Sequence, residues 1–279
     1  KSFVIYLSAM NYIERNSRSF AGYGIDMKKI NKIGVQLFTV GAFMKTEEDI
    51  KRTFERLKKL GYDEAQTAGM PCSYDVFSKL AKEAGIDIVG THEDFEKLTA
   101  DPEAAMNNHK ILNTDIIGIG GLWESTKEGY LNFINRANEF ANKISERGFT
   151  FSYHNHSFEF EKFPDGTLPF DILVDKLDSS KVSFVLDTYW VQYGGGDVRH
   201  LIEKLSGRIK INHLKDMAYL RDAGPYITEI GNGNLYWDGI IETALNSGVE
   251  HFVVEQDSCP GDPFDSLKIS SDYLHANFF

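Results

Sequence analysis

Hydrophobic residues recur along the chain in two alternating patterns. Residues 33–40 (IGVQLFTV) form a short apolar run of strand length. The next segment places Ile50, Phe54 and Leu57 at the spacing of one helix face, and Gly61 is a typical residue at which a helix ends. The pattern predicts a strand followed by a helix that packs against it.

The same strand-then-helix pattern repeats to the end of the chain. Continuously apolar strands that alternate with helices predict a parallel sheet covered by helices, and eight such units close a barrel of about 250 residues. We therefore predict an α/β fold, a single-domain (β/α)8 TIM barrel over residues 27–279. The predicted strands lie within residues 33–40, 62–67, 86–92, 114–121, 149–160, 182–187, 209–214 and 251–255.

Two segments do not follow this pattern. Residues 1–26 show neither a helical period nor a strand alternation that continues into the barrel, and we interpret them as an N-terminal arm of unknown role. Residues 215–236 are rich in Gly, Asp and Asn and exceed the usual length of a connection, which predicts a functional loop. By analogy with other barrels, we expect that the arm mediates a homo-oligomer.

Composition narrows the possible partners. The 279 residues include 41 acidic and 30 basic ones, and the net charge of −11 disfavours binding to nucleic acid and to anionic membrane surfaces. The sequence has no apolar run of the roughly 18 residues that cross a bilayer. We expect a cytoplasmic protein, or a periplasmic one if a leader was removed before Lys1. Cys72 and Cys259 lack the spacing of a disulfide framework or a zinc site.

Polar side chains cluster at the ends of the predicted strands. In a TIM barrel the C-terminal strand ends form the active site. Carboxylates and imidazoles that converge there suit one divalent ion such as Mn²⁺, Mg²⁺, Co²⁺ or Zn²⁺, and without a cation so many carboxylates repel one another. The candidates are Gln36, Glu64, His92, His154, His156, Glu159, Asp187, His213, Lys215 and Glu255.

Six sequence motifs resemble those of the xylose-isomerase-like TIM barrels, the sugar phosphate isomerases and epimerases: IGVQLFT, YHNHSFEF, VLDTYW, INHLKD, EIGNGNLYW and FVVEQD. The resemblance implies one divalent metal held by residues from strands five to eight, and three ligands carry over to Asp187, His213 and Glu255. Many members have Glu-Asn-His where this chain has His154-Asn155-His156. The fourth ligand is then Glu159 or one of the histidines, and we expect Glu159 because a third carboxylate better neutralises a dication.

Two departures from the family pattern bear on function. Trp190 stands where related epimerases and apurinic endonucleases often have a histidine, and we interpret it as a core residue or as a sugar-stacking surface. The loop that begins at Glu229 lacks the Asp-x-His pair of the endonucleases, and together with the acidic charge this argues against DNA cleavage.

The resemblance implies chemistry on a keto-sugar. A bound metal would polarise the carbonyl, and Glu255 on one face with Glu159 or His154 on the other would move the proton on the adjacent carbon. Lys215 would neutralise negative charge or, as we expect, pair with Asp216. The remaining candidates, His156, Trp190, His92, Gln36 and Glu64, would contact substrate.

Several alternatives start from the same residues. Removal of the same proton also begins β-elimination of water, as in inosose dehydratases, and lyase reactions of 3-keto-glycosides. A catalytically silent sugar-binding barrel that uses Trp190, Trp123 and the histidines is the alternative from another class. The sequence shows no Gly-rich phosphate cradle, which favours an unphosphorylated sugar.

Overall fold

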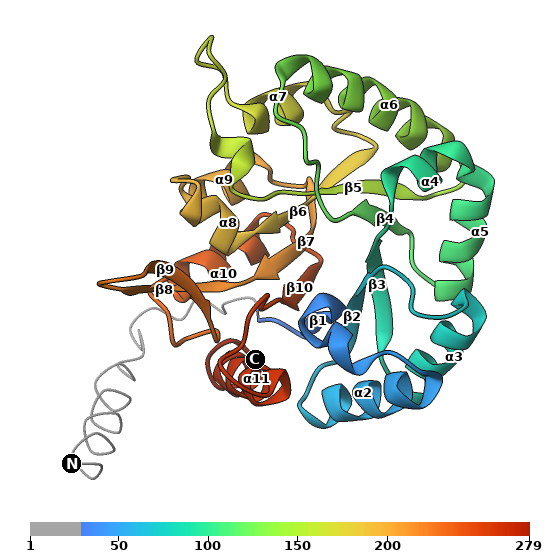
Figure 1. Ribbon diagram of the computed structural model, residues 1–279, viewed down its shortest axis with the longest axis vertical. Coiled ribbons are helices and arrows are strands. Elements are labelled where there is room, and N and C mark those ends of the chain that lie inside the picture. The colour runs from blue at the N-terminus through green and yellow to red at the C-terminus, as the bar shows by residue number, and fades with distance from the viewer. Residues whose placement is uncertain (1–28) are drawn as a thin grey trace.

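The computed structural model describes residues 29–279 and shows a ring of parallel strands surrounded by helices (Figure 1). The strands are hydrogen-bonded in the order β3-β2-β1-β10-β7-β6-β5-β4, and a parallel bridge between Glu93 and Ile119 brings β3 and β4 together. This arrangement confirms the predicted TIM barrel. The barrel strands are β1 (Gly34–Gln36), β2 (Glu64–Ala68), β3 (Asp87–His92), β4 (Ile116–Ile119), β5 (Thr150–His154), β6 (Val182–Asp187), β7 (Ile209–Leu214) and β10 (His251–Val254).

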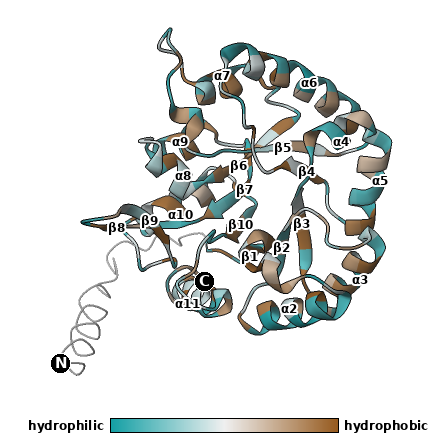
Figure 2. Ribbon diagram, viewed as in Figure 1, coloured by the Kyte–Doolittle hydropathy of each residue, from teal (hydrophilic) through white to brown (hydrophobic). Residues whose placement is uncertain are grey.

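Helices form the outer layer, and hydrophilic residues dominate its outward surface in Figure 2. Side-chain caps begin many of them; for example, Thr46 accepts a hydrogen bond from the backbone N–H of Asp49. The helices are α2 (Glu47–Lys59), α3 (Tyr74–Ala84), α4 (Phe95–Ala100), α5 (Pro102–Leu112), α6 (Lys127–Ser145), α7 (Pro169–Lys176), α8 (Thr188–Tyr193), α9 (Val198–Lys204), α10 (Trp237–Asn246) and α11 (Pro263–Phe278), with 3-10 turns η1 (Leu37–Phe43) and η2 (Phe158–Phe160).

The structure differs from the sequence-based prediction in two connections. The expected first strand ends early, because η1 takes up most of its second half. The expected loop at 215–236 contains an antiparallel hairpin, β8 (Asp216–Leu220) and β9 (Gly224–Thr228), which projects from the barrel (Figure 1). The predicted arm at 1–26 lies outside the described residues.

Buried apolar side chains form two separate clusters. The larger one lies between strands and helices, and a smaller cluster of one residue from each of five strands is separate from it. Because side chains on a strand alternate in direction, residues two positions further along point to the same side as this smaller cluster. The cluster comprises Val89, Ile116, Val185, Ile211 and Val253.

The described residues include no helix that is both long and apolar enough to cross a bilayer.

Candidate active site

Four buried side chains converge at the C-terminal ends of adjacent strands. Asp187, His213 and Glu255 each follow an apolar residue of the smaller cluster by two positions, so they share its direction one layer higher. His154 ends the neighbouring strand β5. One ligand atom from each of these four residues lies within 4.8 Å of the other three, and we call them the ligand group.

The two histidines of the ligand group are fixed by bonds at their outer nitrogens. Nε2 of His213 donates to Oε1 of Gln66 at 2.5 Å, and Nδ1 of His154 donates to the carbonyl oxygen of Gly120 at 3.0 Å, in the tautomers that these acceptors require. The inner nitrogens, Nδ1 of His213 and Nε2 of His154, then face the carboxylates. Such outer bonds are typical of metal-binding histidines.

The donor set fits a divalent ion. Nδ1 of His213 is buried and makes no hydrogen bond within residues 29–279, and it lies 3.0 Å from Oε2 of Glu255. Metal–ligand distances of roughly 2.0–2.2 Å place opposite ligand atoms at most about 4.4 Å apart. The largest separation in the group, 4.8 Å, is only slightly wider, so a small inward movement of one side chain completes the site.

Lys215 supplies a buried positive charge beside the ligand group. Its Nζ lies 3.0 Å from Oδ2 of Asp187, 2.8 Å from Oε2 of Glu255 and 3.1 Å from Oδ1 of Asp257. We expected Lys215 to pair with Asp216, and this was wrong. Asp216 begins β8 and instead accepts hydrogen bonds from Trp237 Nε1 and from backbone N–H groups of the hairpin loop.

These charges set the protonation of the group. Burial alone would raise the pKa of Asp187 and of Glu255, but the Lys215 ammonium together with His154 and His213 outweighs burial and holds both pKa values well below their usual range. Burial lowers the pKa of His92, whose ring lies 5.0 Å from that of His154, and this imidazole stays neutral. The site therefore combines ionised carboxylates, a lysine cation and a neutral imidazole beside them.

Glu159, which we expected as the fourth ligand and as an acid/base, is not in the ligand group. The chain turns back in η2 after β5, and both carboxylate oxygens of Glu159 are already bonded. Oε1 accepts from the hydroxyl of Tyr153 at 2.6 Å, and Oε2 accepts from the backbone N–H of His156 at 2.8 Å. The fourth position in the group belongs to His154, the alternative that the sequence left open.

The pH dependence of stability should reveal this buried carboxyl. Burial raises the pKa of Glu159 to about 7 from an ordinary value of 4.5, so the folded state binds more protons between these two values. The contribution of Glu159 to the free energy of unfolding therefore falls as pH rises from about 4.5 to 7. We expect Glu159→Gln to gain about 2–3 kcal/mol relative to wild type between pH 5 and pH 8 in urea unfolding. The exposed neighbour variant Glu161→Gln should show no such gain, and equal profiles for all three proteins would contradict the assignment.

Glu64, expected as a substrate contact at the end of its strand, lies at the wrong end. It is the first residue of β2, and Oε2 accepts from Nδ1 of His251, the first residue of β10, at 3.0 Å. Gln66, two residues further along β2, is the residue that reaches the site. Sequence reasoning missed it, although an amide at i+2 from a glutamate on a strand shares its face. Gln36 donates to the same Gln66 oxygen at 2.9 Å.

Gln66 positions His213, and its removal should weaken metal binding. In Gln66→Leu the outer nitrogen of His213 loses its acceptor, so the ring no longer holds Nδ1 toward the carboxylates. We expect affinity for Zn²⁺ or Mn²⁺ to fall about 10–100-fold in competition with a chelator. Gln256→Leu, at the end of another strand, is the matched control and should change affinity little. Unchanged affinity in Gln66→Leu would show that His213 is not a ligand through Nδ1.

A family comparison adds to this geometry. The model of the family described as xylose isomerase-like TIM barrel matches residues 54–274. The chain belongs to this family.

Three proteins illustrate what this chain is similar to. Inosose dehydratase of Geobacillus thermodenitrificans (strain NG80-2) is 27% identical over 167 residues, which cover 53% of this chain and 55% of that enzyme. The chain thus matches about half the length of that curated relative. A sugar phosphate isomerase/epimerase from Parabacteroides distasonis ATCC 8503 has a similar structure, with a TM-score of 0.75 and 22% identity over 93% of this chain and 96% of that one. The IOLI protein, described with a bound zinc atom, has a TM-score of 0.64 at 15% identity over 89% of this chain and 99% of that one.

Trp190 and His156 form an aromatic wall beside the ligand group. Trp190 is half-buried, with its ring 5.5 Å from that of His156 and 5.2 Å from Nζ of Lys215. Its Nε1 is buried and has no hydrogen-bond partner in the described part of the chain. Asp187 is the N-cap of α8, and its Oδ1 accepts a hydrogen bond from the backbone N–H of Trp190 at 2.9 Å. This bond holds Trp190 in place relative to the ligand group. Trp190 therefore lies beside the ligand group and not in the barrel core.

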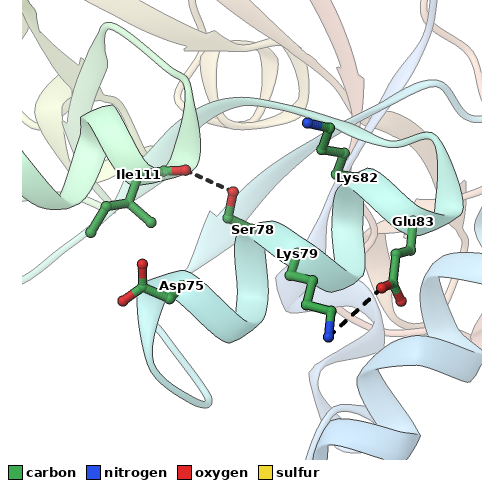
Figure 3. Close-up of a pocket in the computed structure, with 6 residues that line it drawn as sticks. All are labelled: Asp75, Ser78, Lys79, Lys82, Glu83 and Ile111. Atoms are coloured by element: carbon green, nitrogen blue, oxygen red, sulfur yellow. Dashed lines mark hydrogen bonds and ion pairs between the residues drawn. The ribbon is translucent and has the colours of Figure 1, made fainter.

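A separate hollow lies in the outer helix layer between α3 and the end of α5 (Figure 3). The hydroxyl of Ser78 donates a hydrogen bond to the carbonyl oxygen of Ile111 at 2.7 Å. Nζ of Lys79 lies 3.9 Å from Oε1 of Glu83. The charged residues that line it are exposed, as is usual for a helix surface. We assign no function to this hollow, which lies in the helix layer and not at the strand ends.

Proposed function

We propose that the protein is a metal-dependent enzyme that isomerises or epimerises a keto-sugar by removing the proton on the carbon next to the carbonyl. The observation that carries this proposal is the buried ligand group, whose two histidines are held in metal-binding orientation by Gln66 and Gly120. Membership of the xylose isomerase-like family is consistent with sugar chemistry.

His154, Asp187, His213 and Glu255 would hold the ion. When bound, the ion would supply a Lewis acid that polarises the sugar carbonyl and orients the neighbouring hydroxyl. Two imidazoles with two carboxylates suit Zn²⁺, Mn²⁺ or Co²⁺ better than Mg²⁺, which prefers oxygen ligands alone.

The proton on the carbon next to the carbonyl would move to a side chain of the ligand group. Oε2 of Glu255 faces Nδ1 of His213 at 3.0 Å, and we propose it as the proton acceptor. Lys215, whose Nζ lies 2.8 Å from that oxygen, places a positive charge where the substrate oxygen becomes negative. In an isomerisation Glu255 would return the same proton to the neighbouring carbon, while Nε2 of His154 would help to hold the ion.

The surrounding residues suit an uncharged sugar. Nε1 of Trp190 and Nε2 of His92 are buried and unpaired in the described structure, and each N–H could donate a hydrogen bond to a sugar hydroxyl. An unpaired buried polar group costs free energy that a bound ligand recovers. Trp190 and His156 would flank the ring, while Gln36, close to His92, orients that imidazole.

Dehydration is the second candidate, favoured by the similarity to inosose dehydratase. After the same proton is removed, loss of a hydroxyl from the next carbon gives an unsaturated ketone and water. A 3-keto-glycoside lyase would follow the same course with the glycosidic oxygen as the leaving group. The geometry of the ligand group serves all three reactions, so the products decide between them.

The experiment that tests the proposal combines metal analysis with isotope exchange. Protein as purified is analysed for Mn, Zn, Co and Mg, and a panel of keto-sugars is incubated with it in D₂O. We expect close to one metal ion per chain and deuterium at the carbon next to the carbonyl, with an isomer, an epimer or a dehydrated product found by mass spectrometry and NMR. Sugar binding without metal and without exchange would support the silent sugar-binding barrel instead.

A further inference from the structure

Trp123 has the most exposed large hydrophobic side chain within residues 29–279, with 76% of its surface accessible. It follows strand β4 on the side of the barrel where the ligand group lies. An indole left in water forgoes the stabilisation that its burial would give. Single exposed aromatic side chains are common, so the neighbours of this ring decide whether it has a function.

A row of rings connects Trp123 to the ligand group. The ring centroid of Trp123 lies 5.8 Å from that of His156, and the ring of His156 lies 4.7 Å from that of His154, a member of the ligand group. Phe158 supports the row from behind, because its ring stacks on His156 at 5.1 Å with an angle of 8° between the planes. The row leads from the reacting position outward to the surface.

The backbone after β4 is shaped to admit these rings. Gly121 has a φ of +146°, a conformation that side chains rarely adopt. A Cβ built there would lie 2.9 Å from Cε1 of His156 and 3.3 Å from Cη2 of Trp123, so a larger residue would displace them. The preceding residue, Gly120, binds His154 through its carbonyl oxygen. One short turn thus positions all three rings, and the row is a built feature of the site.

We propose that Trp123 is a subsite for a second ring, and that the substrate is a glycoside and not a free monosaccharide. This rests on the proposed function, because the reacting sugar is placed at the ligand group beside Trp190 and His156. Each step of the ring row is comparable with the width of one sugar ring, so a ring linked through the glycosidic oxygen lies against Trp123. The apolar face of a pyranose or an aryl ring stacks on the exposed indole, while its edge stays in water.

The test compares matched ligands that differ by one ring. Metal-loaded protein is titrated calorimetrically with free hexoses of gluco, galacto and manno configuration, with their phenyl glycosides, and with the disaccharides cellobiose, lactose and mannobiose. We expect two-ring ligands to bind at least about tenfold more tightly than the matching hexose. Stronger binding of the phenyl glycosides identifies an aryl second ring, and stronger binding of the disaccharides identifies a sugar.

Variants then assign the gain to Trp123. Trp123→Ala should abolish the tenfold gain and leave hexose affinity within about twofold, whereas Trp123→Phe should retain most of the gain because a ring remains. Ile111→Ala, an exposed apolar residue in the outer helix layer, is the control and should change neither affinity. Thermal melting checks that each variant is folded. Binding of no glycoside, or an equal gain in Trp123→Ala and wild type, overturns the subsite.

The same proteins separate the two proposals. Deuterium exchange on a keto-sugar without any gain from a second ring refutes the subsite and leaves the proposed enzyme intact. A Trp123-dependent gain without exchange on any keto-sugar supports the subsite and refutes the proposed chemistry.

Discussion

Replacing Asp187 by asparagine should remove the metal and nearly all activity while leaving the fold intact. Oδ1 of Asp187 caps α8 by accepting the backbone N–H of Trp190, and the amide oxygen of asparagine preserves this bond. At the other position an NH₂ group replaces Oδ2, which lies 3.0 Å from the Lys215 ammonium. An amide nitrogen in place of Oδ2 cannot bind a cation, and it faces the Lys215 ammonium, which is also a hydrogen-bond donor. We expect less than about one tenth of an ion per chain and a loss of about 10²–10³-fold or more in kcat/KM.

A surface variant shows whether the effect of Asp187→Asn comes from losing any carboxylate or from losing this one. Asp171→Asn removes a carboxylate from an exposed pair with Lys204 and should change neither metal content nor kcat/KM. Metal content is measured by mass spectrometry after gel filtration, and folding by circular dichroism and thermal melting. If the Asp187→Asn protein kept one metal ion per chain and wild-type turnover, the ligand group would not be the metal centre.

The barrel was predictable because its signal is distributed over the whole chain. Each strand-helix unit carries its own apolar period, so an error at one boundary leaves the count of units unchanged. The hairpin at 215–236 was missed because each of its strands has only five residues and Gly, Asp and Asn are frequent around them. Asp216 organises this loop through bonds to Gly231 and Gly233, contacts that no local pattern reveals.

The strand ends were predictable as the place of the site, but individual residues were not. The sequence placed Asp187, His213 and Glu255 on three strand ends, and the structure brings them together. Strand alternation shows that Glu64 and Gln66 share a face. It does not show at which residue the strand begins, so the sequence did not reveal that Glu64 stands at the N-terminal end of β2. The choice between Glu159 and His154 depended on the turn after β5, since η2 carries Glu159 back to Tyr153.

Charge balance at the site was also beyond the sequence. Neighbouring opposite charges made a pair of Lys215 with Asp216 plausible, but successive residues on an extended chain point in opposite directions. Lys215 therefore faces the ligand group while Asp216 faces the hairpin loop. A buried lysine among carboxylates from other strands is a tertiary feature, and only the fold places its partners within reach.

Replacing Lys215 by methionine should destabilise the metal-free protein more than any surface substitution. The side chains are similar in length, so the main change is the loss of a buried ammonium from three carboxylates. Removing one partner leaves the others as uncompensated buried charges, which costs about 3–5 kcal/mol. We expect a decrease of this size in the free energy of unfolding, measured with urea in the presence of a chelator. Lys210→Met, which breaks a surface pair with Glu250, should cost less than about 1 kcal/mol.

Added metal should restore the Lys215→Met protein in part. A divalent ion at the ligand group places positive charge beside the same oxygens of Asp187 and Glu255 that the ammonium contacts. Binding to the folded state alone contributes about 2.7 kcal/mol at a free ion concentration of one hundred times Kd. Because the ammonium no longer compensates these carboxylates, the stabilisation by Zn²⁺ or Mn²⁺ should be larger in Lys215→Met than in wild type. Equal stability of the two proteins in chelator, or an equal gain from metal, would show that lysine and metal do not act on the same carboxylates.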